Sequence, residues 1–191
     1  MTARYVDQSL GEFLDLVAKR QPAPGGGAVA AVTVAVAASL VAMAARYSAD
    51  LLDGGEALID DAERLRAGAA NLADDDAEAY GAVIAAWAAS RGDERSRRQQ
   101  VDAALTRAAG VALEVAELGA ETARLAGRLA VEGKRDVRGD AATALLLAEA
   151  ATRAAARLVA LNVETGGGDG HLVGRAGDSV ATAREAASCL E

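Results

Sequence analysis

Apolar residues recur at intervals of three and four along most of this chain, a period that predicts helices. The first periodic segment is short and has apolar residues at Val6, Leu10, Phe13, Leu14 and Val17. Ser9 and Glu12 stand at the two positions of an N-terminal capping box for this helix. No segment shows a convincing alternation with the period of two that a half-buried strand requires. The pattern therefore predicts an all-α fold.

Glycine-rich and charged breaks divide the rest of the chain into five further segments. The breaks are Asp53–Gly55, Arg91–Asp93, Gly133–Gly139 and Thr165–Gly170. The helices predicted between them span about 27–48, 56–90, 94–132, 140–164 and, with a weaker pattern, 178–190. No internal repeat and no long linker is found, so we expect residues 1–191 to form one domain. We predict a bundle of five to six helices around the long Ala-rich helix 27–48.

Composition restricts both the core and the chemistry of this chain. Hydrophobic residues make up 52% of the 191 residues but aromatic residues only 3%, so the core must be built from Ala, Val and Leu, as in closely packed helices. The formal net charge of −8 argues against nucleic acid as a partner, because Lys and Arg must neutralise phosphates there. The single cysteine, Cys189, and the single histidine, His171, exclude an internal disulfide and a His-rich metal site. Carboxylates remain as the candidates for chemistry.

The sequence also bears on location. The N-terminus lacks the apolar core of a signal peptide, so we expect a cytoplasmic protein. The uncharged run 21–45 is long enough to cross a membrane, but it is rich in Ala and Gly and would gain little energy from insertion. We expect it to be a buried central helix, with no membrane partner.

The segment Pro22–Gly27 reads Pro-Ala-Pro-Gly-Gly-Gly and runs directly into the Ala-rich helix. The first N–H groups of a helix have no acceptor within the helix, and the helix dipole adds positive charge there. An anion or a carbonyl oxygen would bind well at such a place. Glycines at a loop-to-helix junction also permit close packing, and the sequence alone leaves both interpretations open.

One carboxylate of the predicted helix 56–90 falls on its apolar stripe. The stripe is traced by Leu58, Leu65, Leu72, Val83 and Trp87. Asp76 lies on this stripe, with Tyr80 one turn further along the same face. Asp75 lies at the edge of the stripe, and Asp74 points more outward with Glu78. A carboxylate among apolar residues indicates a site, although an acidic solvated face with Asp76 at its margin is the alternative.

Two polar residues of the predicted helix 140–164 have both structural and functional interpretations. Asp140 stands at the start of this helix, where an N-cap is the simpler role. Asn162 shares a helix face with Leu158, and its amide can either bind a ligand or hold a neighbouring helix end.

Four segments together resemble the cyclodeaminase/cyclohydrolase family, the C-terminal domain type of formiminotransferase-cyclodeaminase. They are Pro22–Gly27 with its Ala-rich helix, Leu72–Val83, Val111–Glu117 and Gly133–Val163. The resemblance covers nearly the whole chain and implies an all-helical folate enzyme that acts on a one-carbon unit bridging N5 and N10. Either methenyl-tetrahydrofolate is hydrolysed, or formimino-tetrahydrofolate is closed to the methenyl form with loss of ammonia.

The resemblance also implies roles for individual residues. Asp76 would be the base or the stabiliser of a cation, and Asp140 its partner. The substrate-binding candidates are Pro24, Gly25, Gly26, Gly27, Arg46, Asp75, Tyr80, Lys134 and Asn162. No metal ion and no redox cofactor is implied, since the tetrahydrofolate derivative enters as substrate.

This chain departs from the family pattern at two places. Gly139 replaces the Ser of the family's Ser-Asp pair, and the turn Ser48–Glu56 is acidic where relatives carry lysines. Arg46 and Lys134 are the remaining candidates to bind the glutamate tail of a folate. The alternative function is a non-catalytic helical binding or assembly module that retains the fold. In either case we expect a homodimer, with helix 27–48 near the interface or at the centre of the bundle.

Overall fold

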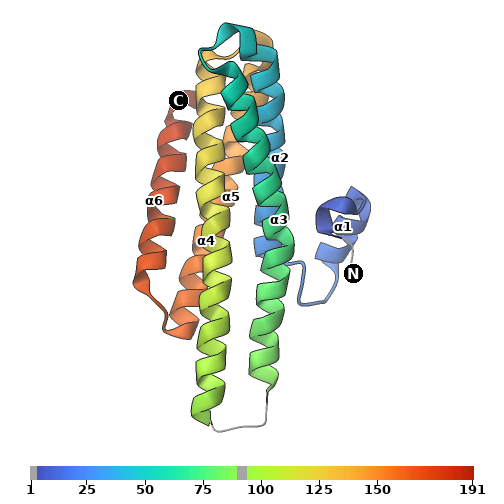
Figure 1. Ribbon diagram of the computed structural model, residues 1–191, viewed down its shortest axis with the longest axis vertical. Helices are drawn as coiled ribbons and strands as arrows, with labels where there is room; N and C mark the ends of the chain where they lie inside the picture. Colours follow the sequence, from blue (N-terminus) through green and yellow to red (C-terminus); the bar gives the residue numbers. More distant parts are fainter. Residues whose placement is uncertain (1–3, 90–93) are drawn as a thin grey trace.

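Six α-helices form an elongated bundle in a computed structural model, which describes residues 4–89 and 94–191 (Figure 1). The helices are α1 (Leu10–Ala18), α2 (Gly26–Ser48), α3 (Gly55–Ala88), α4 (Glu94–Glu132), α5 (Arg138–Gly166) and α6 (Gly170–Ala187). Short 3-10 turns lie at Tyr5–Asp7, Ala49–Leu51, Arg135–Val137 and Ser188–Leu190. The described residues contain no strand, and the predicted all-α fold is confirmed.

Helix α2 lies at the centre of the bundle, as its Ala-rich sequence predicts, and packs against α3, α4 and α5. Its small side chains let these neighbours approach closely, and Val34 and Val41 are completely buried among them. The stretch Gly26–Leu51 is long and apolar enough to cross a membrane by length and composition alone. Most of its apolar window, 61%, is buried inside the bundle, as expected for a core helix.

Helices α3 and α4 are antiparallel, and they extend as a hairpin beyond the N-terminal end of α2 (Figure 1). Val83 on α3 is still buried, with only 1% of its surface exposed, whereas Trp87 one turn later is 51% exposed. The prediction that Trp87 belongs to the buried stripe is therefore wrong. The apolar stripe of α3 continues in the sequence to Trp87. Beyond Val83, however, the hairpin projects past the other helices of the bundle, so no helix in the described part of the chain covers Trp87.

Helix α6 begins eight residues earlier than the weak pattern near Asp178 predicts. The Asp169 side chain accepts a hydrogen bond of 2.8 Å from the His171 N–H and caps the helix. The glycines of this segment lower its helix propensity, which made it look like a loop. Packing of Ala176 and Ala183 against the bundle compensates for that cost.

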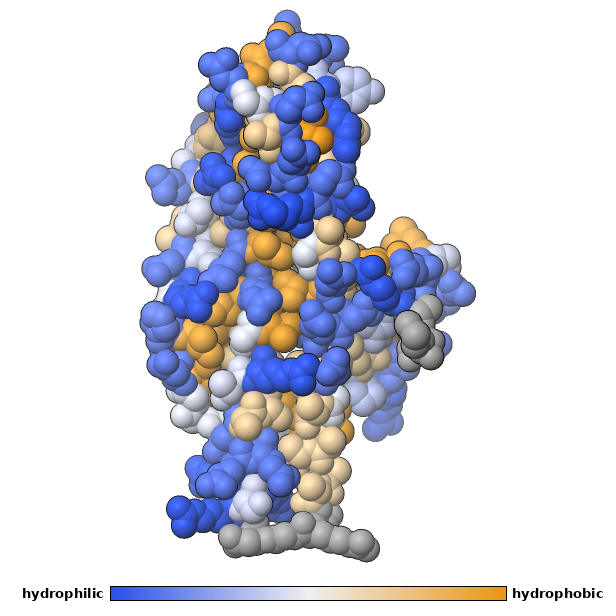
Figure 2. Space-filling view, in the orientation of Figure 1, coloured by the Kyte–Doolittle hydropathy of each residue, from blue (hydrophilic) through white to orange (hydrophobic). Residues whose placement is uncertain are grey.

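Helix α1 stands at the side of the bundle, apart from the other helices (Figure 1). Ser9 and Glu12 form the predicted capping box. Phe13 is buried against Tyr5, but Leu10 and Leu14 are 71% and 57% exposed. Figure 2 shows hydrophobic surface at the upper edge of the protruding segment, amid mostly hydrophilic residues. The helical period of α1 is thus correct, while most of its apolar side chains face solvent.

Candidate functional site

A cavity of about 230 Å³ lies where the N-terminal end of α2 meets α3, α4 and the C-terminal end of α5. Its lining residues are Pro22, Ala23, Gly25, Gly26, Gly27, Asp76, Tyr80, Ala108, Leu158 and Asn162. Six of the eleven predicted site residues are among them: the three glycines, Asp76, Tyr80 and Asn162. The cavity therefore joins the glycine motif to the carboxylate of the apolar stripe.

The glycine motif leaves backbone N–H groups open at this cavity. Gly25 is the N-cap of α2, has an extended backbone (φ −120°) and offers no side chain to cap the helix. The Ala28 N–H donates a hydrogen bond of 2.9 Å to Oδ2 of Asp76. In residues 4–89 and 94–191, the N–H groups of Gly26 and Gly27 have no acceptor. Together with the helix dipole, these two groups form an electropositive wall of the cavity.

The three glycines serve different purposes. A Cβ atom at Gly27 would overlap the Asp76 carboxylate, so glycine is required there for the two helices to approach. A Cβ atom at Gly26 would meet nothing within 4 Å. Neither residue has a positive φ, since among the described residues only Gly54 and Gly167 do. Close packing and open amides, the two interpretations that the sequence left open, thus hold at neighbouring positions of one motif.

Asp76 is half-buried, and its burial raises the pKa of the carboxyl group above the ordinary value. The hydrogen bond from Ala28 N–H opposes this shift but is the smaller effect. No ion pair to Asp76 occurs in the part of the chain that the structure describes. A carboxylate in this setting accepts protons more readily than a solvated one, and it attracts a positively charged ligand.

Asp74, half a turn before Asp76, has a structural role that the sequence did not reveal. Its Oδ1 accepts a hydrogen bond of 3.0 Å from the Tyr5 N–H, and its Oδ2 lies 3.6 Å from Nε of Arg4. The prediction that Asp74 points outward is therefore wrong, because it holds the N-terminal segment against α3. Burial raises the pKa of the Tyr5 hydroxyl, and the charges of Asp74 and Asp76 raise it further.

Two predicted site residues lie near the cavity but do not line it. Asp75 is exposed on the outer side of α3, and Pro24 is buried within the loop that enters α2. Ala23 and Leu158 line the cavity although the sequence did not single them out as site residues. Leu158 precedes Asn162 by one helical turn on the same face of α5, and this spacing could have predicted that it lines the same cavity. Ala108 also lines it, but small residues are so frequent on α4 that nothing marks this one.

Asp140 lies at the opposite end of the bundle from Asn162. Both residues belong to α5. This helix begins at Arg138, so Asp140 is in its first turn rather than at the N-cap position. With a rise of about 1.5 Å per residue, the 22 residues from Asp140 to Asn162 span roughly 33 Å. The prediction that Asp140 is the partner of Asp76 is therefore wrong within one chain.

Arg46 and Lys134 also lie at that far end. Arg46 is in the last turn of α2 and pairs with Glu63 at 2.6 Å. Lys134 follows α4, and its Nζ lies 5.8 Å from the ring centre of Tyr47. Neither cation lies near the cavity, so within one chain both predictions of a substrate contact there are wrong.

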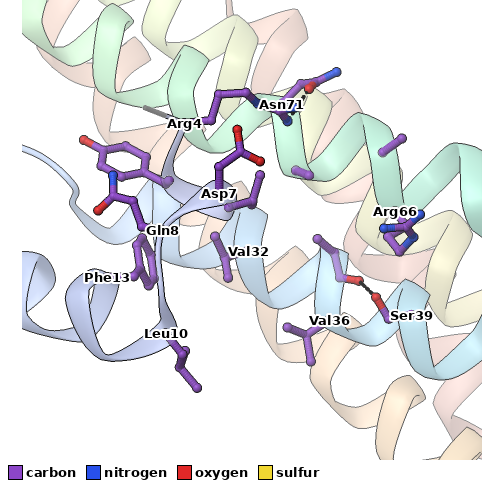
Figure 3. Close-up of a pocket in the computed structure, with 15 residues that line it drawn as sticks. Arg4, Asp7, Gln8, Leu10, Phe13, Val32, Val36, Ser39, Arg66 and Asn71 are labelled. Atoms are coloured by element: carbon purple, nitrogen blue, oxygen red, sulfur yellow. Dashed lines mark hydrogen bonds between the residues drawn. The ribbon is translucent and has the colours of Figure 1, made fainter. Parts of the chain in front are cut away.

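A larger, open cavity of about 510 Å³ lies between the N-terminal segment, α2 and α3 (Figure 3). Arg4 at its rim donates a hydrogen bond of 2.6 Å to Asn71, and Arg66 pairs with Glu63. Much of its wall is apolar, including Leu10, Phe13 and Val36. The charged side chains that line it are exposed, so this cavity lacks the half-buried carboxylate that marks the smaller one.

Comparisons with known proteins agree on one family. A family model described as formiminotransferase-cyclodeaminase matches residues 9–167. A methenyltetrahydrofolate cyclohydrolase of Methylorubrum extorquens is 30% identical over 171 residues, which is 83% of this chain and 80% of that protein. The crystal structure of formiminotetrahydrofolate cyclodeaminase from Thermotoga maritima superimposes with a TM-score of 0.84 at 27% identity, covering 96% of this chain and 93% of the other.

Proposed function

This chain belongs to the formiminotransferase-cyclodeaminase family, and on that premise we propose that it is a folate one-carbon enzyme that hydrolyses methenyl-tetrahydrofolate to the formyl form. The relative with this activity in its name is similar over most of both chains. The observation that carries the proposal is Asp76, a half-buried carboxylate without a cationic partner, facing a cavity beside open backbone amides.

The substrate's charge fits such a carboxylate. The methenyl carbon of the substrate bridges N5 and N10, and the positive charge is shared between the two nitrogens. Asp76 stabilises this cation in a partly desolvated cavity, where an electrostatic interaction is stronger than in water. The raised pKa of Asp76 also makes it a better proton acceptor.

The reaction balances with Asp76 as general base. A water molecule attacks the methenyl carbon, a C–O bond forms, and Asp76 takes a proton from the attacking water. The C–N5 bond of the tetrahedral adduct then breaks with its electron pair remaining on N5. N5 takes up a proton, the hydroxyl of the adduct loses one as it becomes the carbonyl, and the formyl group stays on N10. One proton in total is released to solvent per molecule of water consumed. This step needs one carboxylate.

The remaining cavity residues orient the substrate. The open N–H groups of Gly26 and Gly27 donate to an acceptor edge of the pterin ring. Asn162 carries both a donor and an acceptor, which matches the amide-like edge of a pterin. Tyr80 supplies an aromatic wall.

Formimino-tetrahydrofolate cyclodeaminase is the second candidate, favoured by the structural similarity to the Thermotoga maritima enzyme. In that reaction N10 attacks the formimino carbon, and the departing ammonia must gain a proton.

To distinguish the two reactions, purified protein is incubated with each substrate separately. We expect loss of methenyl absorbance with methenyl-tetrahydrofolate and no enzymatic ammonia release with formimino-tetrahydrofolate. The reverse result would assign the cyclodeaminase, and binding without turnover of either would assign a non-catalytic module.

A homodimer remains part of the proposal. The support is the exposed apolar side of α1 together with Val36, which is 49% exposed on α2. A second copy of this chain would bury these residues, and burial of exposed hydrophobic surface favours association. Light scattering at micromolar concentration checks the expected dimer, and Leu10→Glu combined with Leu14→Glu is expected to give monomers. A monomeric unmodified protein would remove the proposal of a dimer and leave the enzymatic one intact.

A further inference from the structure

The α3–α4 hairpin projects beyond the end of α2 (Figure 1). It carries a further cavity, of about 400 Å³, beyond the one that contains Asp76. Its lining residues are Trp87, Glu94, Arg97, Arg98 and Val101. Nothing in the proposed reaction uses these residues. Trp87 is half-exposed, at 51%, although burial of so large an aromatic ring is favourable.

The two cavities lie along the same face of the hairpin. On α3, Tyr80, Ile84 and Trp87 follow Asp76 at steps of four, four and three residues, which keeps them on one helix face. On α4, Val101 lies two turns before Ala108, and the pair Arg97 and Arg98 lies one turn further out. We refer to the cavity at Trp87, together with the helix faces that connect it to Tyr80 on α3 and to Val101 on α4, as the hairpin groove.

The chemistry of the hairpin groove suits an aromatic ring followed by carboxylates. An exposed tryptophan offers a face for stacking. In the described part of the chain, neither Arg97 nor Arg98 forms an ion pair, so both guanidinium groups are available for carboxylates. Among the described residues, Glu94 is the one acidic residue that lines this cavity, and it weakens the attraction for an anion.

The distance between the two cavities also suits a single extended ligand. The seven residues from Tyr80 to Trp87 span about 10 Å along α3. A ligand that fills the Asp76 cavity and extends from it by about this length reaches Trp87 and the two arginines. Arg46 and Lys134, which the sequence offered for the glutamate tail, lie at the other end of the bundle.

We propose that the hairpin groove binds the p-aminobenzoyl-glutamate arm of the substrate, with Trp87 stacking on the ring and Arg97 and Arg98 holding the glutamate carboxylates. This inference rests on the proposed function, because that function supplies a ligand with such an arm. It makes Trp87, Arg97 and Arg98 determinants of substrate affinity, and Glu94 a residue that limits it.

Trp87 is the only tryptophan of the chain, so its fluorescence reports on this groove alone. We expect p-aminobenzoyl-glutamate, used as an isolated fragment, to quench this fluorescence with saturation. The double variant Arg97→Gln/Arg98→Gln should raise the Kd of the fragment about tenfold or more. Glu94→Gln should lower it. Arg95→Gln is the matched control, since Arg95 lies on α4 but does not line the cavity. Quenching that is absent, or equal in the double variant and the control, would overturn the proposal.

A second measurement separates this inference from the proposed function. Methenyl-tetrahydrofolate is compared with the corresponding pteroyl compound, which lacks the glutamate, in the unmodified protein and in Arg97→Gln/Arg98→Gln. The preference for the glutamate-bearing substrate should fall about tenfold in the double variant. An unchanged preference would exclude the two arginines as glutamate ligands. If fragment binding follows the expectation but no turnover is found with either compound, the groove is supported and the proposed reaction is wrong.

Discussion

The two ends of helix α2 are built from similar residues, but only one of them forms a cavity with an available carboxylate. At the N-terminal end, glycines and Asp76 surround about 230 Å³ of space. At the C-terminal end, a Cβ atom at Gly55 would overlap the backbone of Ala49, and one at Gly133 would overlap the Leu129 carbonyl. Buried Ser48 there accepts a hydrogen bond of 2.9 Å from the Lys134 N–H.

The comparison shows that a glycine or a carboxylate near a helix end is not by itself a site. At the C-terminal end of α2, Gly55 and Gly133 lie in tight contacts, and Ser48 and Arg46 already have partners within the chain, Lys134 and Glu63. At the N-terminal end only Gly27 is used for packing, while the N–H groups of Gly26 and Gly27 remain without acceptors in the described residues. Unsatisfied groups beside a cavity are what distinguishes the site.

The largest effect is expected from Asp76→Asn. The variant keeps the acceptor for Ala28 N–H but loses the charge and the base, so turnover should fall about 10²- to 10⁴-fold. Steady-state kinetics checks this, with Asp75→Asn as the control, because Asp75 is exposed on the same helix and does not line the cavity. Full activity of Asp76→Asn would refute the catalytic role.

The raised pKa of Asp76 adds a pH dependence to this prediction. Because burial favours the neutral carboxyl, the folded protein holds its proton more tightly than the unfolded chain, and stability is lost as pH rises through the folded-state pKa. At pH 7, Asp76→Asn should therefore melt at the same temperature as the unmodified protein or higher, and this advantage should vanish at acidic pH. A variant clearly less stable at pH 7 would contradict the assignment.

Gly27→Ala and Gly55→Ala sharpen the comparison between the two ends of α2. The new methyl group at Gly27 displaces the Asp76 carboxylate, and a shift of this kind should lower turnover about 10²-fold. Gly55→Ala should lower stability by about 1–3 kcal/mol through overpacking, with kcat and KM of the folded protein unchanged. Kinetics beside melting curves on both variants tests this. Equal losses of activity would mean that the two ends do not differ.

Gly26→Val should weaken ligand binding more than folding. A Cβ atom there meets nothing within 4 Å, so the side chain projects into the space that a ligand must enter. The stability cost should stay below about 1 kcal/mol, because the position is an exposed first helical residue without a positive φ. Calorimetry of folate binding is measured beside a melting curve. Preserved affinity in a destabilised variant would leave the glycine motif as a packing device.

The smallest effects are expected at the far end of the bundle. Arg46→Gln, Lys134→Gln and Asp140→Asn should each change kcat/KM by less than about twofold, since these exposed or half-exposed residues lie roughly 30 Å from the cavity. Steady-state kinetics on the three variants checks this. A large loss in any of them would indicate that a second copy of the chain brings its far end to this cavity.

The sequence by itself determined most of the helices. Periodicity and glycine breaks are local signals, and they predicted both ends of α2, α3, α4 and α5 to within two residues, although the end predicted at residue 90 itself lies outside the described residues. The same periodicity placed Asp76, of three consecutive aspartates, on the inward face of α3, where it lines the cavity, because the direction of a side chain follows from its place on a helix. It could also have excluded Arg46, which lies 19 residues after Gly27 on one predicted helix.

Only the tertiary structure decided which apolar and polar surfaces are covered. Leu14 and Trp87 occupy regular helical positions yet are exposed, because no neighbouring helix reaches them. Asp74 looks like a solvated residue in the pattern, but the chain folds Tyr5 back onto it. Burial and hydrogen-bond partners depend on segments distant in sequence, 69 residues apart in this pair, and no local pattern records which segments will meet.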